Sequence, residues 1–244
     1  MSDIGGNEPT GYNYAAADTL KAKASNLQGK LYAQKGSRSS AVWYAMREFR
    51  GHYSEIFDRN AEVASEGRRE VANALGQLAS WVVELKEAAE AEDQRREDAR
   101  AWAERQRQRE DNLLAGAWHE VTTWFGGGDD PQPPPAEDPP NFHSDVVQVQ
   151  GREIDPPAGN SSTSSAVPTD LRHFQTRTGE LDDELASAVS QFETALSDYE
   201  AGCNSAWGNL NGQPVLTAIN SWLEDNAGDA EWAGRVAEAF EAAG

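Results

Sequence analysis

The strongest pattern in the chain is a one-sided row of apolar positions in its second half. Successive members are separated by alternating steps of three and four residues, and Thr178 is the one polar member. Side chains with this spacing lie along one side of an α-helix, which cannot bury them alone. The row predicts a long helix that ends near Gly202. Its start is expected just after Pro168, with Thr169 or Asp170 as the cap. The members are Leu171, Phe174, Thr178, Leu181, Leu185, Ala188, Phe192, Ala195 and Tyr199.

Similar spacing opens the chain. A first helix is predicted from Tyr14 to about Gln34, with Ala17, Leu20, Ala24, Leu27 and Leu31 on one side. The glycine and serines at positions 36–40 predict a break after it, and a second helix is expected to begin near Val42. Its row contains Phe49, Tyr53, Ile56, Asn60, Val63, Gly67, Val71, Ala74, Leu78, Trp81, Leu85 and Ala88.

The second helix can continue into a highly charged segment, although a single helix from Val42 to Ala117 would span on the order of 110 Å and a bend is expected. Residues 90–111 contain neither glycine nor proline, and opposite charges recur four residues apart. This pattern favours an uninterrupted helix that is solvated on nearly all sides. Trp102 has no apolar neighbours at helical spacing in this segment, so it is the candidate there for an exposed side chain that contacts a partner.

A proline-rich segment separates the two helical regions. Nine of the eleven prolines fall within residues 126–168, which predicts an extended tether. Beyond the long helix, Trp207 and Gly208 mark a turn. A helix over Val215–Asn226 follows, and Asp229 is expected to cap a last helix. The predicted fold is all-α, with two helical hairpins whose long helices pack as in a coiled coil. Its parts are a disordered N-terminus (1–13), a hairpin with the extended charged helix (14–125), the linker (126–168) and a second hairpin (169–244).

The charge of the chain is uneven. The formal net charge is -20, and residues 126–244 carry 4 Lys and Arg against 21 Asp and Glu. Such an acidic half would be repelled by nucleic acid and by anionic membranes, so neither is expected as a partner. Solubility explains the charge, and a basic partner or a basic secretion channel is the alternative. No run approaches the roughly 18 apolar residues of a membrane span.

Candidate catalytic chemistry is missing from the sequence. The four histidines show no metal-ligand spacing, and there is no metal, nucleophile-elbow or phosphate-loop motif. Cys203 is the only cysteine and has no obvious base beside it. We therefore expect a protein that is not an enzyme and has no catalytic, cofactor-binding or metal site.

The tryptophans divide into two groups. Trp207 stands beside a glycine in a turn, where an indole can close the open end of a hairpin while glycine permits the reversal. Core packing is the expected role of those on apolar rows, which are Trp43, Trp81, Trp222 and Trp232.

A helix, a Trp-Gly turn and a second helix resemble the plan of the WXG superfamily, the small helical-hairpin substrates of type VII secretion. The C-terminal residues 222–226, 229–232 and 236–244 are most similar to the N-terminal trafficking region of actinobacterial polymorphic toxins exported by that route. The chain departs from the pattern at both turns. The first turn, Trp43-Tyr44-Ala45, lacks the glycine of the motif. In the second turn, Trp207-Gly208-Asn209, the glycine directly follows the tryptophan, one position earlier than in the motif.

The resemblance also implies an export signal of the form Tyr-x-x-x-Asp/Glu, which normally follows the second helix of a hairpin. Here the spacing occurs at Tyr14 and Asp18 and at Tyr44 and Glu48, both outside that place. Export would then depend on a partner that carries the signal. The N-terminus has neither the positive start nor the apolar stretch of a signal peptide. The expected localisation is secreted or at the cell envelope by a signal-peptide-independent route, and cytoplasmic before export.

The implied function is a non-catalytic secretion substrate or toxin-delivery module that binds small helical WXG-like proteins or the secretion machinery. A toxin domain beyond Gly244 is part of that expectation. The unpaired apolar rows would pack against a helical partner or against each other, and the partner-facing seam is expected to contain Val71, Leu78, Trp81, Leu85, Leu181, Leu185 and Phe192. The alternative is a structural coiled-coil scaffold or spacer, which predicts a parallel homo-oligomer.

Overall fold

A computed structural model of the chain describes residues 8–115, 132–142, 152, 164–203 and 206–243. The helices are α1 (Tyr14–Ala33), α2 (Lys35–Met46), α3 (His52–Ala115), α4 (Pro168–Gly202) and α5 (Gln213–Ala243), with one 3-10 turn, η1 (Ala206–Gly208). Outside these helices the described chain consists of turns, bends and extended segments, and its β-structure is limited to isolated bridges. The predicted all-α class is therefore confirmed for the part of the chain that is described. None of the described helices combines the length and apolar character that a membrane crossing demands.

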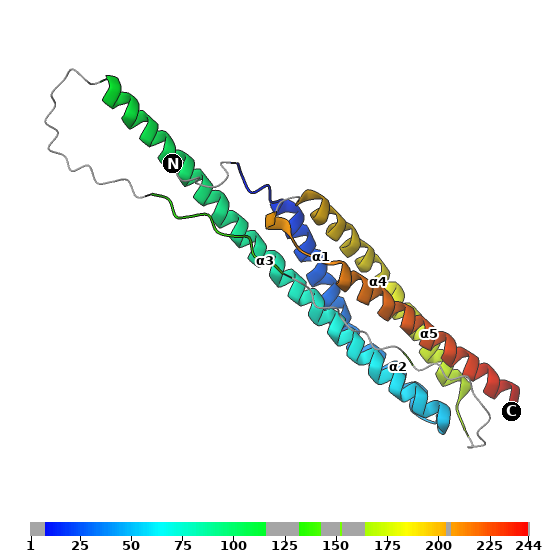
Figure 1. Ribbon diagram of the computed structural model, residues 1–244. Helices are drawn as coiled ribbons and strands as arrows, with labels where there is room; N and C mark the ends of the chain where they lie inside the picture. The colour runs from blue at the N-terminus through cyan, green and yellow to red at the C-terminus, as the bar shows by residue number, and fades with distance from the viewer. Residues whose placement is uncertain (1–7, 116–131, 143–151, 153–163, 204–205, 244) are drawn as a thin grey trace.

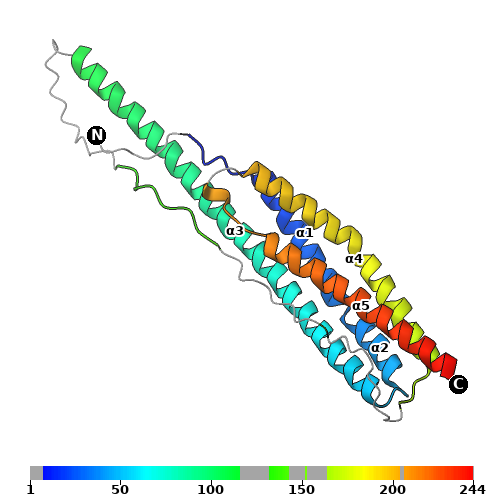
Figure 2. The same ribbon diagram turned by 45° about the vertical axis from the view of Figure 1, so that its right-hand side comes forward.

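The helices form an elongated four-rod bundle (Figure 1). One rod is made by α1 and α2, which are separated only by a bend at Gln34. This rod packs on α3 and α4, and α5 packs on the same two helices from the other side, so neighbouring rods run antiparallel (Figure 2). The two predicted hairpins thus share one bundle.

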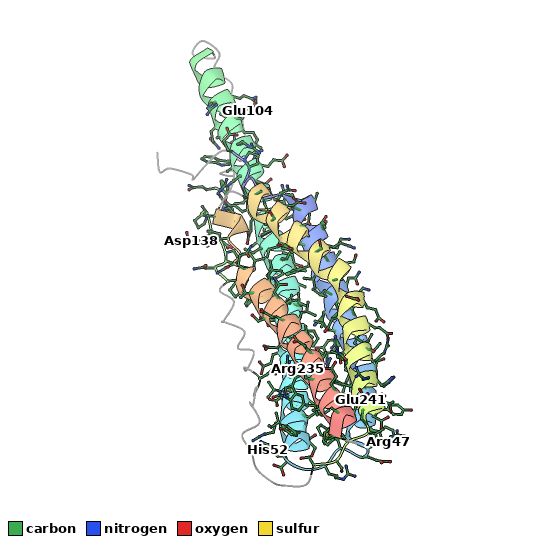
Figure 3. The ribbon with its side chains drawn as sticks, turned by 90° about the vertical axis from the view of Figure 1, so that its right-hand side faces the viewer. Arg47, His52, Glu104, Asp138, Arg235 and Glu241 are labelled. Atoms are coloured by element: carbon green, nitrogen blue, oxygen red, sulfur yellow. The ribbon has the colours of Figure 1, made fainter. Side chains whose placement is uncertain are left out.

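The longest rod, α3, projects beyond the others. Its 64 residues correspond to about 95 Å at 1.5 Å per residue. Glu104 lies on the projecting part, whereas Arg47, His52 and Glu241 lie at the opposite end of the bundle (Figure 3). Helix α3 continues through the charged segment to Ala115 as one rod, so the expected bend is wrong (Figure 1).

Two apolar cores are buried in the bundle. The large core joins α1, the middle of α3, α4, η1 and the start of α5. The small core joins α2, the beginnings of α3 and α4 and the end of α5. The large core includes Leu20, Leu27, Leu31, Val71, Leu75, Leu78, Leu85, Leu185, Phe192, Tyr199, Trp207, Ile219 and Trp222. The small core contains Ala41, Ala45, Phe49, Ile56, Phe57, Leu171, Phe174, Trp232, Ala233, Val236 and Ala237.

The apolar row of α4 is buried as its spacing predicts. All nine of its members are buried, including Thr178. The row packs against α5, α1 and α3, which supply the partner surface that a single helix lacks. Its start differs slightly from the prediction, since Pro168 is the first helical residue and Val167 caps it without a side-chain hydrogen bond.

The predicted break at residues 36–40 is wrong. These residues lie within α2, and the chain turns at residues 47–51 instead. Gly51 has φ +91°, and a Cβ there would lie 2.6 Å from the Ser164 hydroxyl, so this position requires glycine. Gly36 faces open space and costs the helix only its modest intrinsic propensity.

The last two predicted helices are one. Helix α5 continues through Gly228 because burial of Ala230, Trp232 and Ala233 offsets the roughly 1 kcal/mol that a helical glycine costs. Asp229 is buried inside this helix and caps nothing.

Extended segments follow α3 on its outer side. Residues 8–13 are described and pack on α3, with Thr10 and Tyr12 buried, so the prediction of disorder is wrong for this part of 1–13. The described parts of the linker descend along α3. Their contacts are with Arg95 (Pro134), Trp81 (Phe142), Asn60 (Arg152) and Arg50 (Ser165).

Candidate functional site

The bundle contains a half-open groove of about 410 Å³ between α2 and α3. The two helices meet at the turn near residue 50 but are otherwise separated, and α4 and α5 form the floor. Because α2 and α3 run antiparallel, the groove has two distinct ends. The apolar end, next to the turn, is formed by Val42, Met46, Phe57, Phe174 and Trp232. The basic end, about 16 Å away by helix rise, is formed by Lys35, Arg38 and Arg68.

The apolar end is the side of the small core that faces the groove, and its Phe57, Phe174 and Trp232 rings are at most 9% exposed. The Phe57 ring stacks with Trp232 at a centroid distance of 6.4 Å and meets Phe174 edge-on at 4.8 Å. Val42 and Met46 are only partly buried, because the groove separates them from α3. This surface offers apolar and aromatic contacts to an occupant.

The basic end is dominated by Arg68, which is only 5% exposed. Its Nη1 donates to the Leu31 carbonyl at 3.0 Å, at the bend between α1 and α2. Burial lowers the pKa of Arg68, and the nearby Arg38 guanidinium lowers it further. No carboxylate among the described residues pairs with Arg68. The positive charge at this end is thus poorly compensated, which is costly for a desolvated cation.

A buried polar layer lies beside the middle of the groove. Arg152, whose side chain is 3% exposed, reaches it from the linker and donates to the Asn60 carbonyl at 2.8 Å and to Asn226 Oδ1 at 3.0 Å. Asp229 Oδ2 lies 3.5 Å from Arg152 Nε, and its other oxygen accepts from Asn60 Nδ2 at 3.0 Å. This layer ties the linker to α3 and α5.

The same layer extends to α2 and α4. Arg38 pairs with Asp182, which also accepts a bond from Asn226, and the Arg38 guanidinium lies 4.7 Å from the Trp222 ring centre. The Trp222 indole N–H donates to the Ala64 carbonyl at 3.0 Å. Arg38 is therefore already engaged, in contrast to Arg68.

Burial sets the titration of the layer. It raises the pKa of Asp229 to about 6, against the opposing effect of Arg152 and the Asn60 hydrogen bond. Burial also raises the pKa of Asp182 and lowers that of Arg152. These shifts reflect the cost of holding charges away from water.

Three exposed aromatic side chains on the α1–α2 rod, which we call the aromatic stripe, border the groove through Trp43. The stripe is defined by Tyr32, Trp43 and Tyr44, which are 45%, 61% and 42% exposed. The predictions of Trp43 as a core residue and as the residue of a hairpin turn are wrong. It lies inside α2, whose buried side is occupied by Ala41 and Ala45, and its ring points outward. Trp43 instead lines the groove rim and meets Tyr44 edge-on.

Trp207 and Gly208 are placed as predicted. Both are buried in η1, between α4 and α5, and Trp207 belongs to the large core. A Cβ at Gly208 would collide with the Cβ of Cys203 at the end of α4, so this position requires glycine. Burial raises the pKa of the Cys203 thiol, which favours its uncharged form.

The two Tyr-x-x-x-Asp/Glu matches have different surroundings. The Tyr14 hydroxyl donates to Asp93 Oδ2 at 2.7 Å, and Asp18 accepts from Lys86 at 2.8 Å, so both side chains turn toward α3. Tyr44 is half-exposed beside the His173 ring, and Glu48 is exposed in the turn after α2.

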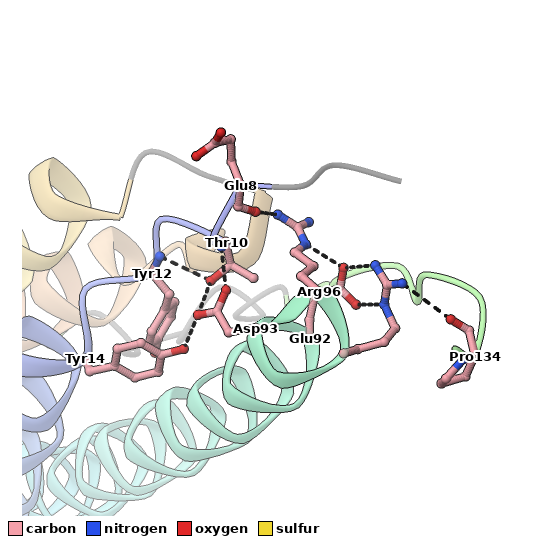
Figure 4. Close-up of polar contacts among 9 residues, drawn as sticks. Glu8, Thr10, Tyr12, Tyr14, Glu92, Asp93, Arg96 and Pro134 are labelled. Atoms are coloured by element: carbon pink, nitrogen blue, oxygen red, sulfur yellow. Dashed lines mark hydrogen bonds and ion pairs between the residues drawn. The ribbon is translucent and has the colours of Figure 1, made fainter. Parts of the chain in front are cut away.

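A polar clamp holds the N-terminal segment and the linker to α3 (Figure 4). Asp93 accepts from the Thr10 amide and hydroxyl at 2.6 and 3.0 Å as well as from Tyr14. Burial opposes ionisation of Asp93, yet these hydrogen bonds prevail and lower its pKa. The charged part of α3 is thus partly covered here, against the prediction of solvation on nearly all sides.

The second half of the clamp is centred on Glu92. Its carboxylate pairs with Arg95 at 2.6 Å and with Arg96 at 2.7 Å, and these hydrogen bonds lower its pKa to about 2. Arg95 also donates to the Pro134 carbonyl, and Arg96 donates to the Glu8 carbonyl (Figure 4).

The seam expected to face a partner is instead buried within the chain. The prediction of a seam that faces a partner is wrong. The apolar rows of α1, α3, α4 and α5 pack against each other instead, which was the alternative to a helical partner. Trp81 alone is partly exposed, stacked on Phe142 at 5.7 Å. The fully closed members are Val71, Leu78, Leu85, Leu181, Leu185 and Phe192.

The groove and the polar layer escaped the sequence analysis. The signals were Asn60 and Thr178, polar residues at positions of apolar rows that both line the groove. Arg152 gave none, since it lies in a linker without helical periodicity. Among the described residues no group of three or more His, Cys, Asp or Glu could hold a metal ion. Comparisons with family models, with curated proteins and with solved structures give no match to this chain.

Proposed function

We propose that this chain is a non-catalytic type VII secretion substrate or toxin-delivery module that binds helical partner proteins. The aromatic stripe of Tyr32, Trp43 and Tyr44 carries the proposal. Exposed Trp and Tyr side chains are the residues that most often anchor protein interfaces. Because the apolar seam is buried inside the bundle, the three side chains of the stripe are the exposed large apolar groups that the described residues offer to a partner.

The helical hairpin with its buried Trp207 and Gly208 turn supports the secretion part of the proposal by its resemblance to WXG proteins. The Tyr14 and Asp18 side chains are engaged with α3, so a machinery that read them would have to compete with Asp93 and Lys86. A partner that carries the export signal avoids this competition.

Export can be measured in the source organism with and without the type VII ATPase. The chain should leave the cell only when the ATPase is present. Unchanged export in the deletion strain would contradict the secretion proposal, whatever the partner surface is.

Partner binding can be tested separately with a photo-crosslinking residue in place of Trp43, and with the same residue in place of Arg235 as a control. Arg235 is exposed on α5, away from the stripe. A small helical protein should crosslink at position 43 and not at 235. Equal crosslinking at both positions would contradict a partner site on the stripe.

A structural spacer is the second candidate, because α3 projects well beyond the rest of the bundle (Figure 1). A spacer of this kind should form a parallel homo-oligomer, whereas the delivery module should be a monomer or a heterodimer. Light scattering on the purified chain distinguishes them.

A further inference from the structure

The groove between α2 and α3 shares Trp43 with the aromatic stripe, but partner binding at the stripe does not use the chemical difference between the two ends of the groove. One end is apolar and aromatic, the other holds the buried Arg68, and the volume of about 410 Å³ lies in the range typical of small-molecule sites, roughly 300–1,000 Å³. An occupant matching both ends must itself have an apolar body and one anionic group.

We propose that this groove binds one free fatty acid, with its carboxylate at the basic end on Arg68 and its acyl chain at the apolar end over Phe57 and Trp232. This goes beyond the proposed secretion role and does not depend on it. A guanidinium donates two parallel hydrogen bonds to a carboxylate, and such charge-assisted bonds are strong where water is excluded.

The other charges around the groove leave Arg68 as the specific anchor. Arg38 is already paired with Asp182, and Asp229 faces Arg152. Lys35 is exposed at the same end and adds a second positive charge. Asp58 and Glu62 also line the groove but are exposed on the α3 rim, where water and salt screen them.

The length of the groove suits one extended alkyl chain. Residues 57 and 68 of α3 are separated by about 16 Å of helix rise. A chain of this length would cover Val42 and Met46 on the α2 side, which are partly buried without it. Burial of this apolar area is the main driving force expected for binding.

The test is titration of the full chain with dodecanoate below its micelle concentration, followed by calorimetry and tryptophan fluorescence. We expect one site per chain. Dodecanol, which lacks the charge, should bind about tenfold or more weakly, and dodecyltrimethylammonium should not compete. Equal binding of dodecanol and dodecanoate would overturn the proposal.

Matched variants locate the site. Arg68→Gln should weaken dodecanoate binding by about tenfold or more, whereas Arg69→Gln, an exposed neighbour paired with Glu66, should stay within about twofold. Ala61→Phe should fill the groove and abolish binding, and Ala101→Phe, at an exposed position elsewhere on α3, should not. The comparison of Ala61→Phe with Ala101→Phe keeps the test valid even if loss of Arg68 unfolds the chain.

Other occupants have distinct outcomes. Flotation of the chain with anionic vesicles, without binding of free dodecanoate, would assign the groove to a membrane surface and overturn the proposal. A helical partner that Ala61→Phe excludes and that dodecanoate does not displace would assign it to a protein and overturn it as well. Retained dodecanoate binding in Ala61→Phe would place the ligand elsewhere.

Discussion

The large and small cores of this bundle differ in how completely they close. In the large core, α1 contributes Leu20, Leu27 and Leu31, each with no exposed surface. In the small core, α2 buries only Ala41 and Ala45. Large side chains on α1 reach both α3 and α4, whereas α2, which buries only alanines, packs mainly on α4. A single bent rod thus closes one half of the bundle and leaves a groove in the other.

The closed large core and the open small core are therefore expected to differ in what they contribute: the large core to stability, and the region of the groove to binding. Leucine-rich packing at native density leaves no room for an occupant. The groove exists where side-chain volume is missing, and the exposed aromatic stripe lies along the same rod. The polar layer marks the boundary between the two halves, so changes to each part should have different consequences.

The largest loss is expected at the polar layer. Arg152→Ala would leave the Asp229 carboxylate and the Asn60 carbonyl without their cationic partner, and breaking a buried pair in this way costs about 3–5 kcal/mol. Urea unfolding would measure the loss. Arg235→Ala, which removes an exposed pair on α5, should cost less than about 1 kcal/mol. Similar losses in both variants would show that the layer is no more important than the surface.

The next prediction compares the cores directly. Leu78→Ala removes a fully buried side chain from the large core and should cost about 2–5 kcal/mol. Val42→Ala, at the partly open wall of the groove, should cost less than about 1 kcal/mol because little burial is lost. Urea unfolding of the two variants gives the comparison, and equal costs would mean that the small core is closed as tightly as the large one.

Most of the helical fold could be predicted from periodicity. The row from Leu171 to Tyr199 requires a partner surface, and the structure provides one. The errors lie where local propensity was outweighed by packing. The serines and glycine at 36–40 have low helix propensity, yet Ala41 and Ala45 hold that segment on α4. The real turn depends on Gly51, whose role is visible only once Ser164 approaches it.

The site was harder to predict because its parts are distant in sequence. Arg68 belongs to a charged surface pattern, and only the bend between α1 and α2 places the Leu31 carbonyl over it. Periodicity predicts which side of a helix is apolar, but not whether two helices will meet along it. The groove therefore follows from a shortage of volume on α2 that no local pattern reports.

The polar layer also gives a pH dependence. Burial raises the pKa of Asp229 from 3.8 to about 6, so between these values the folded chain holds a proton that the unfolded chain has released. The contribution of this residue to stability therefore falls as the pH rises from about 4 to 6, and the full penalty applies above that window. Asp229→Asn should remove this part of the slope in urea unfolding measured across the window.

The control for this prediction is Asp58→Asn, which changes an exposed carboxylate in the groove. Its slope should match that of the unmodified chain. Part of the slope should survive in Asp229→Asn, because burial also raises the pKa values of Asp182 and Asp225. If the Asp229→Asn and unmodified profiles were parallel, the carboxylate would not be the group that titrates.

The smallest effect on stability is expected for the aromatic stripe, because its side chains are exposed and contribute little to either core. Trp43 is 61% exposed, so Trp43→Ala should change the free energy of unfolding by no more than about 0.5 kcal/mol. The same variant should lose part of the iodide-quenchable fluorescence, whereas Trp222→Phe, at a side chain with no exposed surface, should leave that part intact. A clear loss of stability in Trp43→Ala would mean that the stripe belongs to the small core and is not a free surface. Unchanged stability of Trp43→Ala, together with loss of partner crosslinking from a photo-crosslinking residue at position 32, would identify the stripe as an interface.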